Sequence, residues 1–422
     1  MEFLSQKKII IIAIVVITVI VSGVITVSSN NDNISQPSPA QQSDLAGEVL
    51  IGSILPLTGD MSTIGEETFL ATKLAVDDFN KHLEENGEPW HLKLVPEDSA
   101  TNPVMTLEKL TSLNAKGIGV VIGPATSANI HNIKGYVDSN NMLILSCCST
   151  APALAIPGDN VFRLVTDDHN QANVLAKLAQ KQEIGVLVPV YRGDTWGDGL
   201  VLATKEHFTK LGGIVDDGIR YNPESPEFSA SASLLADRVD ELVKQHGSDK
   251  VAVLLVSFTE GLHLMQSASS YDILSSVRWF GSDGNAKDEN IVKDPIGREF
   301  TDSVGFTSIV VSAVDNPINE HVKTELVKLI GRTPITYTYS SYDAVWIAGL
   351  AMLDTKSTDV NTIKEAIPRI TDTYSGALGS TKLNPAGDLA EADYEVWKTS
   401  DGKWMITSSY ASSTDTINDI SN

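Results

Sequence analysis

Cysteine is almost absent from this chain of 422 residues, and the two that occur, Cys147 and Cys148, are adjacent. Neighbouring cysteines cannot supply the spaced ligands of a zinc site, and they cannot close a long loop. Two interpretations fit the pair, a strained vicinal disulfide and two small buried thiols. We expect the two thiols.

The sequence motifs of the common enzyme classes are also missing. There is no Gly-x-x-x-x-Gly-Lys-Ser/Thr loop, no His-Glu-x-x-His pair and no Gly-x-Ser-x-Gly turn. Gly117 and Gly119 precede an expected strand instead of following one, so they lack the context of a dinucleotide-binding loop. We therefore expect a protein that is not an enzyme and that holds neither a metal nor a cofactor.

Positive charge is scarce, because 31 lysines and arginines stand against 54 aspartates and glutamates, which gives a net charge of −23. Nucleic-acid binding depends on neutralising phosphates, so nucleic acid is not expected as a partner. Hydrophobic residues make up 42% of the chain, as is usual for folded proteins. The length is sufficient for two domains, each with its own core.

One long apolar run occurs, from Ile9 to Val27, directly after Lys7 and Lys8. It is long enough to cross a bilayer as a helix and longer than the usual apolar core of a signal peptide. The basic flank predicts that residues 1–8 are a cytoplasmic stub and that the rest lies outside the cell. We expect an uncleaved transmembrane anchor; the alternative is a cleaved signal and a secreted protein.

Residues 28–47 are rich in Ser, Asn, Gln and Pro, which is typical of a flexible linker. After them, short β-branched runs alternate with amphipathic helices, the first of which has Ala71, Leu74 and Phe79 on one face. Such alternation predicts parallel sheets with helices on both faces, and its restart predicts two lobes. The expected strands are 49–55, 92–95, 118–122, 142–145, 184–190, 213–221 and 251–256.

The end of the chain has a different pattern. Two β-branched runs flank Asp401-Gly402, which predicts a hairpin with a two-residue turn. The residues from Ser408 are rich in Ser, Thr and Asp, so we expect them to fray, with residues 411–422 as a disordered tail.

Hydroxyl-bearing loops follow the expected strands of the first half, ending at Ser127 and at Thr150. Hydroxyls beside the free N–H groups of a helix start suit a carboxylate or another anion. In the second half, the corresponding loops bring Trp196, Phe258 and Asp283. These side chains suit an ammonium group and an apolar side chain.

With these loops the sequence resembles the leucine/isoleucine/valine-binding family of periplasmic solute receptors. The similar segments come in that family's order and span the chain from Glu48 to about Lys403. They are Ile51–Asp60 with Gly65, Ala75–Asn80, Val120–Ser127, Ser149–Leu154, Trp196–Leu200, Phe280–Gly284 and Ser341–Ala344. Each segment is weak alone, and their shared order and spacing are specific.

The resemblance implies a periplasmic binding protein type I fold, an α/β fold with two doubly wound, Rossmann-like lobes. Three crossovers near Thr166, Ser312 and Leu383 would form the hinge. The lobes would comprise residues 48–166 with 312–383, and 167–311 with 384–410.

The resemblance also implies how a ligand is held. In that family a serine hydroxyl of one loop, and a threonine with the main chain of the next, hold the ligand's α-carboxylate. Ser127, Thr150 and the main chain of Cys148 match these positions. Both hydroxyls also have a simpler use as helix caps.

The remaining site residues match the family less closely. The acidic residue that meets the α-ammonium falls on Asp283, which is shorter than the family's usual glutamate and also suits a plain turn. Trp196 and Phe258 stand where tyrosines are usual, so two hydroxyls are missing, and Trp196 also fits a core position. Ile64 falls on the first-lobe wall.

The expected function is that of an extracellular receptor that closes around a small amino acid, branched-chain or similar, and delivers it to the permease of an ABC importer. Three alternatives remain. They are a receptor of the same fold for a short amide or urea, which would not need Asp283, a sensory ectodomain, and an enzyme on a two-lobed scaffold.

Overall fold

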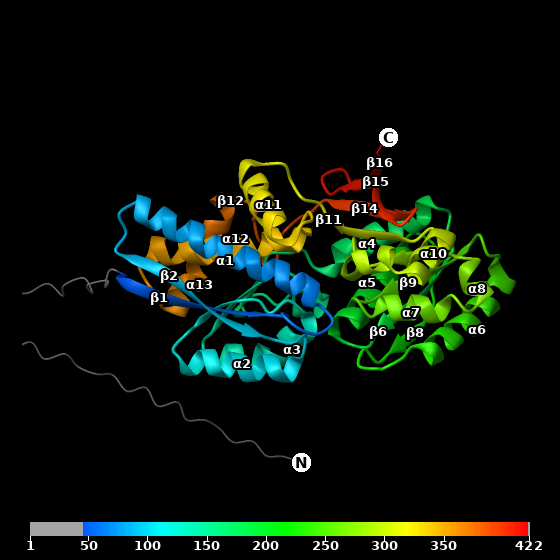
Figure 1. Ribbon diagram of the computed structural model, residues 1–422, viewed down its shortest axis with the longest axis horizontal. Helices are drawn as coiled ribbons and strands as arrows, with labels where there is room; N and C mark the ends of the chain where they lie inside the picture. Colours follow the sequence, from blue (N-terminus) through cyan, green and yellow to red (C-terminus); the bar gives the residue numbers. More distant parts are fainter. Residues whose placement is uncertain (1–44, 421–422) are drawn as a thin grey trace, which may run out of the picture. The chain divides into compact units, whose positions relative to one another are not determined.

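The computed structural model describes residues 45–420 (Figure 1). The expected cytoplasmic stub, the apolar segment 9–27 and nearly all of the linker lie outside this range. Among the described residues, no helix is both long and apolar enough to cross a membrane. The anchor therefore stays a prediction.

The first sheet has five parallel strands in the order β2-β1-β3-β4-β5. Their bounds are Trp90–Asp98, Gly47–Leu55, Val120–Ile122, Leu143–Ser146 and Val161–Arg163. Helices cover both faces of this sheet, α2 and α3 on one and the others on the opposite face (Figure 1). They are α1 (Ser62–Glu85), α2 (Pro103–Ala115), α3 (Ser127–Ser139), α11 (Pro317–Ile330), α12 (Thr336–Thr355) and α13 (Val360–Thr373). We call this sheet with its helices the first lobe.

The second sheet has the order β16-β15-β14-β11-β10-β9-β6-β7, with β8 also paired to β6. Strands β6 to β11 run parallel, and β14, β15 and β16 add an antiparallel edge. Their bounds are β6 Val186–Arg192, β7 Ile214–Val215, β8 Ile219–Tyr221, β9 Val251–Val256, β10 Arg278–Gly281, β11 Thr307–Val311, β14 Tyr394–Ser400, β15 Lys403–Ala411 and β16 Thr416–Asp419. We call this sheet with its helices the second lobe.

The helices of the second lobe also lie on both faces of their sheet, with α4 and α5 on one face. Their bounds are α4 Asp168–Lys181, α5 Thr195–Lys210, α6 Ser229–His246, α7 Gly261–Ala268, α8 Asp272–Ser275, α9 Glu289–Lys293 and α10 Pro295–Val304. Two 3-10 turns, η1 (Pro152–Leu154) and η2 (Asp283–Asn285), and the short pair β12 (Ser375–Gly376) and β13 (Gly379–Ser380) complete the described chain.

The α/β fold with two doubly wound sheets is therefore confirmed. In the described residues, the chain passes between the lobes three times, after β5, after β11 and after β13. The hinge positions expected near Thr166, Ser312 and Leu383 fall within these connections. The exact lobe boundaries stay predictions.

Two local expectations are wrong. The single strand expected at 213–221 is two short strands, because Gly218 breaks it with a positive φ of 65°, and a Cβ there would come within 2.1 Å of the Pro189 carbonyl oxygen. The residues from Ser408 do not fray, since β15 continues to Ala411 and pairs with β16.

Lysines on α4 contact the polar C-terminal segment that contains β16. The Lys177 ammonium lies 2.9 Å from the Asp415 carboxylate, and Lys181 lies 2.6 Å from Asp419. The acidic residues that suggested a solvated tail therefore tie it to the second lobe. The Asp401-Gly402 hairpin is confirmed, with Ser400 paired to Lys403.

A buried ion pair joins the end of β5 to the third connection between the lobes. Arg163 donates through Nε and Nη2 to the two carboxylate oxygens of Asp388, at 2.5 and 2.6 Å, and neither side chain is exposed by more than 1%. Arg163 Nη1 also donates to the carbonyl oxygens of Ser149 and Ala151. One guanidinium thus holds the loop after β4 against the connection that follows β13.

We expect Arg163→Met to lower the free energy of unfolding by about 3–5 kcal/mol, because it leaves a buried carboxylate without its partner. Urea denaturation measures this. The matched control is Arg220→Met, which breaks the exposed Arg220–Asp198 pair and should cost less than about 1 kcal/mol. Equal effects of the two substitutions would contradict a special role for Arg163.

Candidate functional site

Each sheet has one point where the strand order reverses direction, and the loops at these points face each other across the two lobes. In the first sheet the point lies between β1 and β3, and in the second it lies between β6 and β9. Ligands of open α/β sheets bind outside the carboxyl ends of the strands at such points. The loops there lead to Ile64, Ser127, Trp196 and Phe258.

All but one of the sequence-predicted site residues line a single cavity between the lobes. They are Ile64, Ser127, Cys148, Trp196, Phe258 and Asp283, joined by Met61, Ala125, Thr126, Gly284 and Tyr337. The cavity has a volume of about 20 Å³, far below the roughly 300–1,000 Å³ of small-molecule sites. The lobes are therefore closed, and a ligand can enter only when they part.

Ser127 is the first residue of α3, and the residue that caps this helix is Thr126, whose hydroxyl accepts the Asn129 N–H. The interpretation of Ser127 as the cap is therefore wrong. The Ser127 hydroxyl instead accepts the Ala151 N–H at 3.1 Å and lies 3.0 Å from the Ser149 hydroxyl. It belongs to a polar cluster at the cavity.

Thr150 is the one predicted residue that does not line the cavity. Its hydroxyl donates to the carboxylate of Asp168 at 3.0 Å, and its carbonyl oxygen accepts the Asp168 N–H. Thr150 is thus tied to the start of α4 in this closed arrangement. Its contact with a ligand carboxylate stays a prediction.

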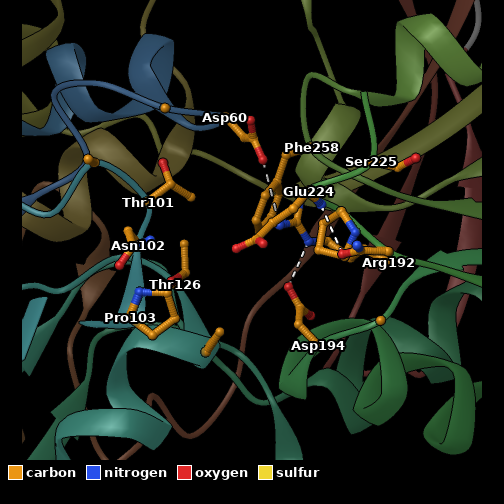
Figure 2. A pocket seen from close by; sticks show the side chains of 16 residues that line it. Asp60, Thr101, Asn102, Pro103, Thr126, Arg192, Asp194, Glu224, Ser225 and Phe258 are labelled. Atoms are coloured by element: carbon orange, nitrogen blue, oxygen red, sulfur yellow. Dashed lines mark hydrogen bonds and ion pairs between the residues drawn. The ribbon is translucent and has the colours of Figure 1, made fainter. Parts of the chain in front are cut away.

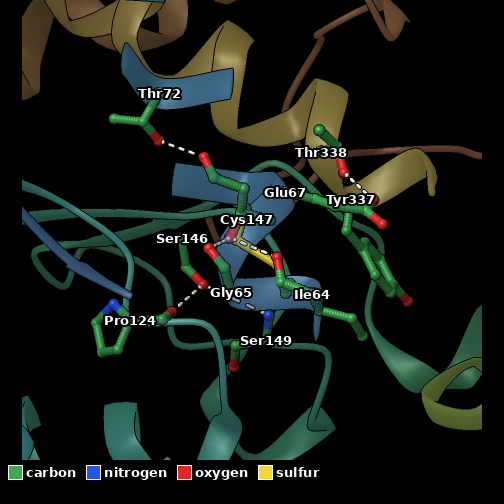
Figure 3. The surroundings of a disulfide bond; sticks show 12 residues. Ile64, Gly65, Glu67, Thr72, Pro124, Ser146, Cys147, Ser149, Tyr337 and Thr338 are labelled. Carbon is green, nitrogen blue, oxygen red and sulfur yellow. Dashed lines mark hydrogen bonds between the residues drawn. A yellow bond between two sulfur atoms is a disulfide. The ribbon is translucent and has the colours of Figure 1, made fainter. Parts of the chain in front are cut away.

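The loop after β4 also contains the two cysteines, and they are joined by a disulfide (Figure 3). The expectation of two thiols is therefore wrong, although the expectation that they are buried is confirmed. The burial signal alone could not separate the two cases, because both forms are small and apolar. Cys148 lies on the cavity side, and both sulfur-bearing residues pack near Tyr337.

The second lobe supplies an aromatic wall. The rings of Trp196 and Phe258 stack with their centroids 4.7 Å apart and an interplanar angle of 9°. Asp194 caps α5 by accepting the N–H groups of Trp196 and Gly197, which fixes the position of Trp196. Trp196 packs in the second-lobe core and also lines the cavity, and its contact with a ligand stays a prediction.

Asp283 lies in η2 after β10 and is 6% exposed. Its Oδ2 accepts the hydroxyl of Tyr337, which belongs to the first lobe, while its Oδ1 is buried with no hydrogen-bond partner among the described residues. Its N–H donates to Gln171 Oε1, and Gln171 Nε2 donates to Asp168 Oδ1. Gln171 therefore connects two buried carboxylates.

Burial dominates the electrostatics of these groups. It raises the pKa of Asp283, although the hydrogen bonds from Tyr337 and Gln171 act in the opposite direction. Burial raises the pKa of Asp168 well above its usual value, and the nearby charge of Asp283 raises it further. Neither carboxylate has an ammonium or guanidinium group within hydrogen-bond distance among residues 45–420.

A wider cleft adjoins the cavity and shares Thr126 and Phe258 with it. Its volume is about 570 Å³, and Figure 2 shows first-lobe residues such as Asp60 facing Arg192 and Glu224 of the second lobe. The Arg192 guanidinium lies over the Phe258 ring at 4.0 Å from its centroid. The cleft therefore provides polar space directly beside the aromatic wall.

Contacts between the lobes also occur at the edge of this cleft. The Thr259 hydroxyl donates to the Asp60 carbonyl oxygen at 2.7 Å, and the Arg192 guanidinium lies 3.9 Å from the Asp60 carboxylate. Arg192 has stronger partners in its own lobe, at 2.5 Å to Glu260 and 2.7 Å to Asp194. These contacts accompany the closed arrangement of the lobes.

Sequence reasoning missed Asp168, Gln171 and Tyr337. Asp168 and Gln171 lie at the start of α4. Polar residues are common there as helix caps, so their presence does not indicate a ligand site. Tyr337 lies at the start of a largely buried helix and reads as core. An available signal was the position of Asp168 just beyond a predicted hinge.

Comparison with known proteins identifies the family. The model of the family described as "Receptor family ligand binding region" matches residues 67–402. The chain belongs to this family. The two relatives and the solved structure described next are each matched over more than nine tenths of their own length.

Two relatives align with most of this chain. The name of the first gives no function, and the name of the second refers to leucine, isoleucine and valine. An uncharacterized protein of Methanocaldococcus jannaschii is 27% identical, over 88% of this chain and 91% of that protein. The "Leu/Ile/Val-binding protein homolog 3" of Brucella melitensis is 25% identical, over 84% of this chain and 92% of that protein.

A solved structure shows the same fold. The leucine-binding protein LivK of Thermotoga maritima superimposes with a TM-score of 0.72 at 20% sequence identity, covering 86% of this chain and 98% of that one. This likeness confirms the expected periplasmic binding protein fold for this member of the receptor ligand-binding family.

Gly284 offers a direct test of the site. A Cβ at this position would come within 2.6 Å of the Trp196 ring and of the Ser257 carbonyl oxygen, so Gly284→Ala should displace Asp283 and the aromatic wall. We expect ligand binding to weaken at least about 10-fold, or about 1.4 kcal/mol. Calorimetry measures the change in ligand affinity, and thermal unfolding measures any change in stability.

The control is Gly135→Ala in α3, where an added Cβ meets no atom within 4 Å. Alanine favours a helix over glycine, so this variant should unfold at an equal or higher temperature and bind as the wild type does. Unchanged binding by Gly284→Ala would show that the cavity is not the ligand site.

Proposed function

We propose that this chain is an extracellular solute-binding protein of an ABC importer, which holds a small amino acid in the cavity between its lobes. It acts by binding and hinge closure, without catalysis. The observation that carries the amino-acid assignment is the unpartnered, buried Oδ1 of Asp283 in a cavity that also contains the Ser127 hydroxyl. The names of the relatives and of the leucine-binding structure support it.

The two charged ends of an amino acid fit opposite sides of this cavity. Ser127, at the start of α3, and the main chain around Cys148 suit the α-carboxylate, because free N–H groups at a helix start attract an anion. Asp283 suits the α-ammonium, since a buried carboxylate needs a cationic partner. The zwitterion would thus supply the partner that Asp283 Oδ1 lacks among the described residues.

The side chain of the ligand would lie against Trp196 and Phe258, with Ile64 on the first-lobe side. These apolar surfaces favour a branched-chain or similar amino acid. The wider cleft begins at Phe258, so a longer side chain has space to extend toward it. The ligand favours the closed form only through contacts that it makes with both lobes.

Delivery to an importer follows from closure, because the permease would recognise the closed lobes with the ligand inside. The apolar segment 9–27 would anchor the protein to the outer face of the cytoplasmic membrane, with residues 28–44 as its linker. Cleavage of that segment would release the same receptor. A receptor for a short amide or urea is the second candidate, and it has no use for the charge of Asp283.

The deciding experiment is Asp283→Asn, which keeps the shape and removes the charge. We expect amino-acid affinity to fall by about 3 kcal/mol or more, because the ammonium loses its buried anion. A thermal-shift screen of amino acids, short amides and urea identifies the ligand. Calorimetry then measures its affinity for the wild type and for Asp283→Asn.

The control for this substitution is Asp302→Asn, at an exposed position on α10 away from the cavity. It should leave binding unchanged. A wild type that binds only neutral amides, with Asp283→Asn unaffected, would replace the amino-acid proposal with the second candidate.

We also expect amino-acid affinity to fall as the pH is lowered from 8 to 5. Burial raises the pKa of both Asp283 and Asp168, so the empty site takes up a proton at a higher pH than free carboxylates do. The ligand ammonium binds the deprotonated form, and binding therefore releases protons in the acid range. Calorimetry in two buffers of different ionisation enthalpy measures that release; affinity that is constant or rises toward acid would refute it.

A further inference from the structure

Tyr337 is a cavity residue that comes from the opposite lobe to Asp283. It is the second residue of α12, which follows α11 in the first lobe, and it is 4% exposed. Its ring packs with Leu55, Ala125 and the two cysteines in a small apolar cluster of the first lobe. The ring is thus fixed to one lobe while its hydroxyl reaches the other.

The hydroxyl of Tyr337 donates to Oδ2 of Asp283. The backbone of Asp283 is held separately, through Gln171 on α4 of the same lobe. Among the described side chains, Tyr337 is therefore the hydrogen-bond donor that the first lobe supplies to this carboxylate, whereas Gln171 acts on it from the same lobe. With Oδ2 occupied, Oδ1 is the oxygen that remains for a ligand.

We propose that Tyr337 is a positioning residue of the ligand site, which orients Asp283 toward the ligand's amino group only when the lobes are closed. This inference rests on the proposed amino-acid function and deepens it. When the lobes part, the hydroxyl leaves with the first lobe, and the carboxylate loses the donor that fixes its orientation. The protein then recognises the ligand's amino group at the same step in which the lobes close.

The same hydrogen bond favours a charged amino group over a neutral one. A donor to a carboxylate stabilises its ionised form, and an ionised carboxylate prefers a cation as its second partner. Burial raises the pKa of Tyr337 well above its usual value, so the hydroxyl keeps its proton at neutral pH.

Other ionisable groups face this carboxylate and bear on the pH dependence of binding. Asp168 on α4 lies nearby and raises the proton affinity of the pair, and Tyr394 on β14 lies close to both carboxylates. Arg163 acts on Asp168 from a distance, and its guanidinium is already paired with Asp388. None of these groups donates a hydrogen bond to Asp283.

The test is Tyr337→Phe, which removes the hydroxyl and keeps the ring. The probe is the standard L-amino acid that raises the melting temperature of the wild type most. We expect its affinity to fall about 10- to 100-fold, the usual effect of losing a hydrogen bond to a charged group. The pH at which affinity is lost on acidification should also move upward, because Asp283 loses a donor to its ionised form.

The matched control is Tyr339→Phe, on the same helix, since the Tyr339 side chain is largely buried and its hydroxyl makes no hydrogen bond to residues 45–420. It should change neither affinity nor the pH midpoint. Tyr337→Phe with wild-type affinity would overturn the proposal, and so would a weaker affinity with an unmoved pH midpoint, which would mean a packing role alone.

The experiments distinguish a failure of the proposed amino-acid function from a failure of the proposed role of Tyr337. If the wild type binds none of the twenty amino acids, the proposed function fails and Tyr337 loses its role with it. If the wild type binds an amino acid and Asp283→Asn does not, while Tyr337→Phe equals the wild type, the function stands and only the role of Tyr337 is wrong.

Discussion

The buried contact between Arg163 and Asp388 is the constraint on which the site depends. A guanidinium excluded from water must have its donors satisfied, and here the carboxylate and two loop carbonyls satisfy them. Those carbonyls flank Thr150, so the loop after β4 cannot move without exposing the buried charge. The disulfide and the Ser127 contact to Ala151 belong to the same loop. Its geometry is therefore set before any ligand arrives.

The second lobe has the opposite property, because its central charge is unmatched. Asp283 and Asp168 are buried beside each other with hydroxyl and amide donors, and no cationic side chain of residues 45–420 lies within hydrogen-bond distance of either. Such an arrangement costs stability in the empty protein. It is tolerated where function requires it, and an ammonium group that enters between the lobes would remove that cost. A fixed loop on one side and an incompletely partnered carboxylate on the other are the features on which the proposed zwitterion site depends.

Much of the site could be predicted from the sequence, because its residues lie in loops that directly follow predictable strands. Ser127, Trp196, Phe258 and Asp283 come from four different loops, yet the rule that parallel strands share one carboxyl edge is enough to bring them together. Prediction failed where local composition is ambiguous. The two cysteines look alike as thiols or as a disulfide, and the acidic C-terminal segment looks solvated until the lysines of α4 are placed beside it.

The sequence by itself determined the strand and helix alternation, the two lobes and the loops that carry the ligand residues, since these depend on periodicity and on short-range turn chemistry. Only the tertiary structure decided which side chains pair with each other. Arg163 and Asp388 are 225 residues apart, and Tyr337 and Asp283 are 54 residues apart and belong to different lobes. Pairings of that kind depend on how the chain crosses between the sheets, and no local pattern records them.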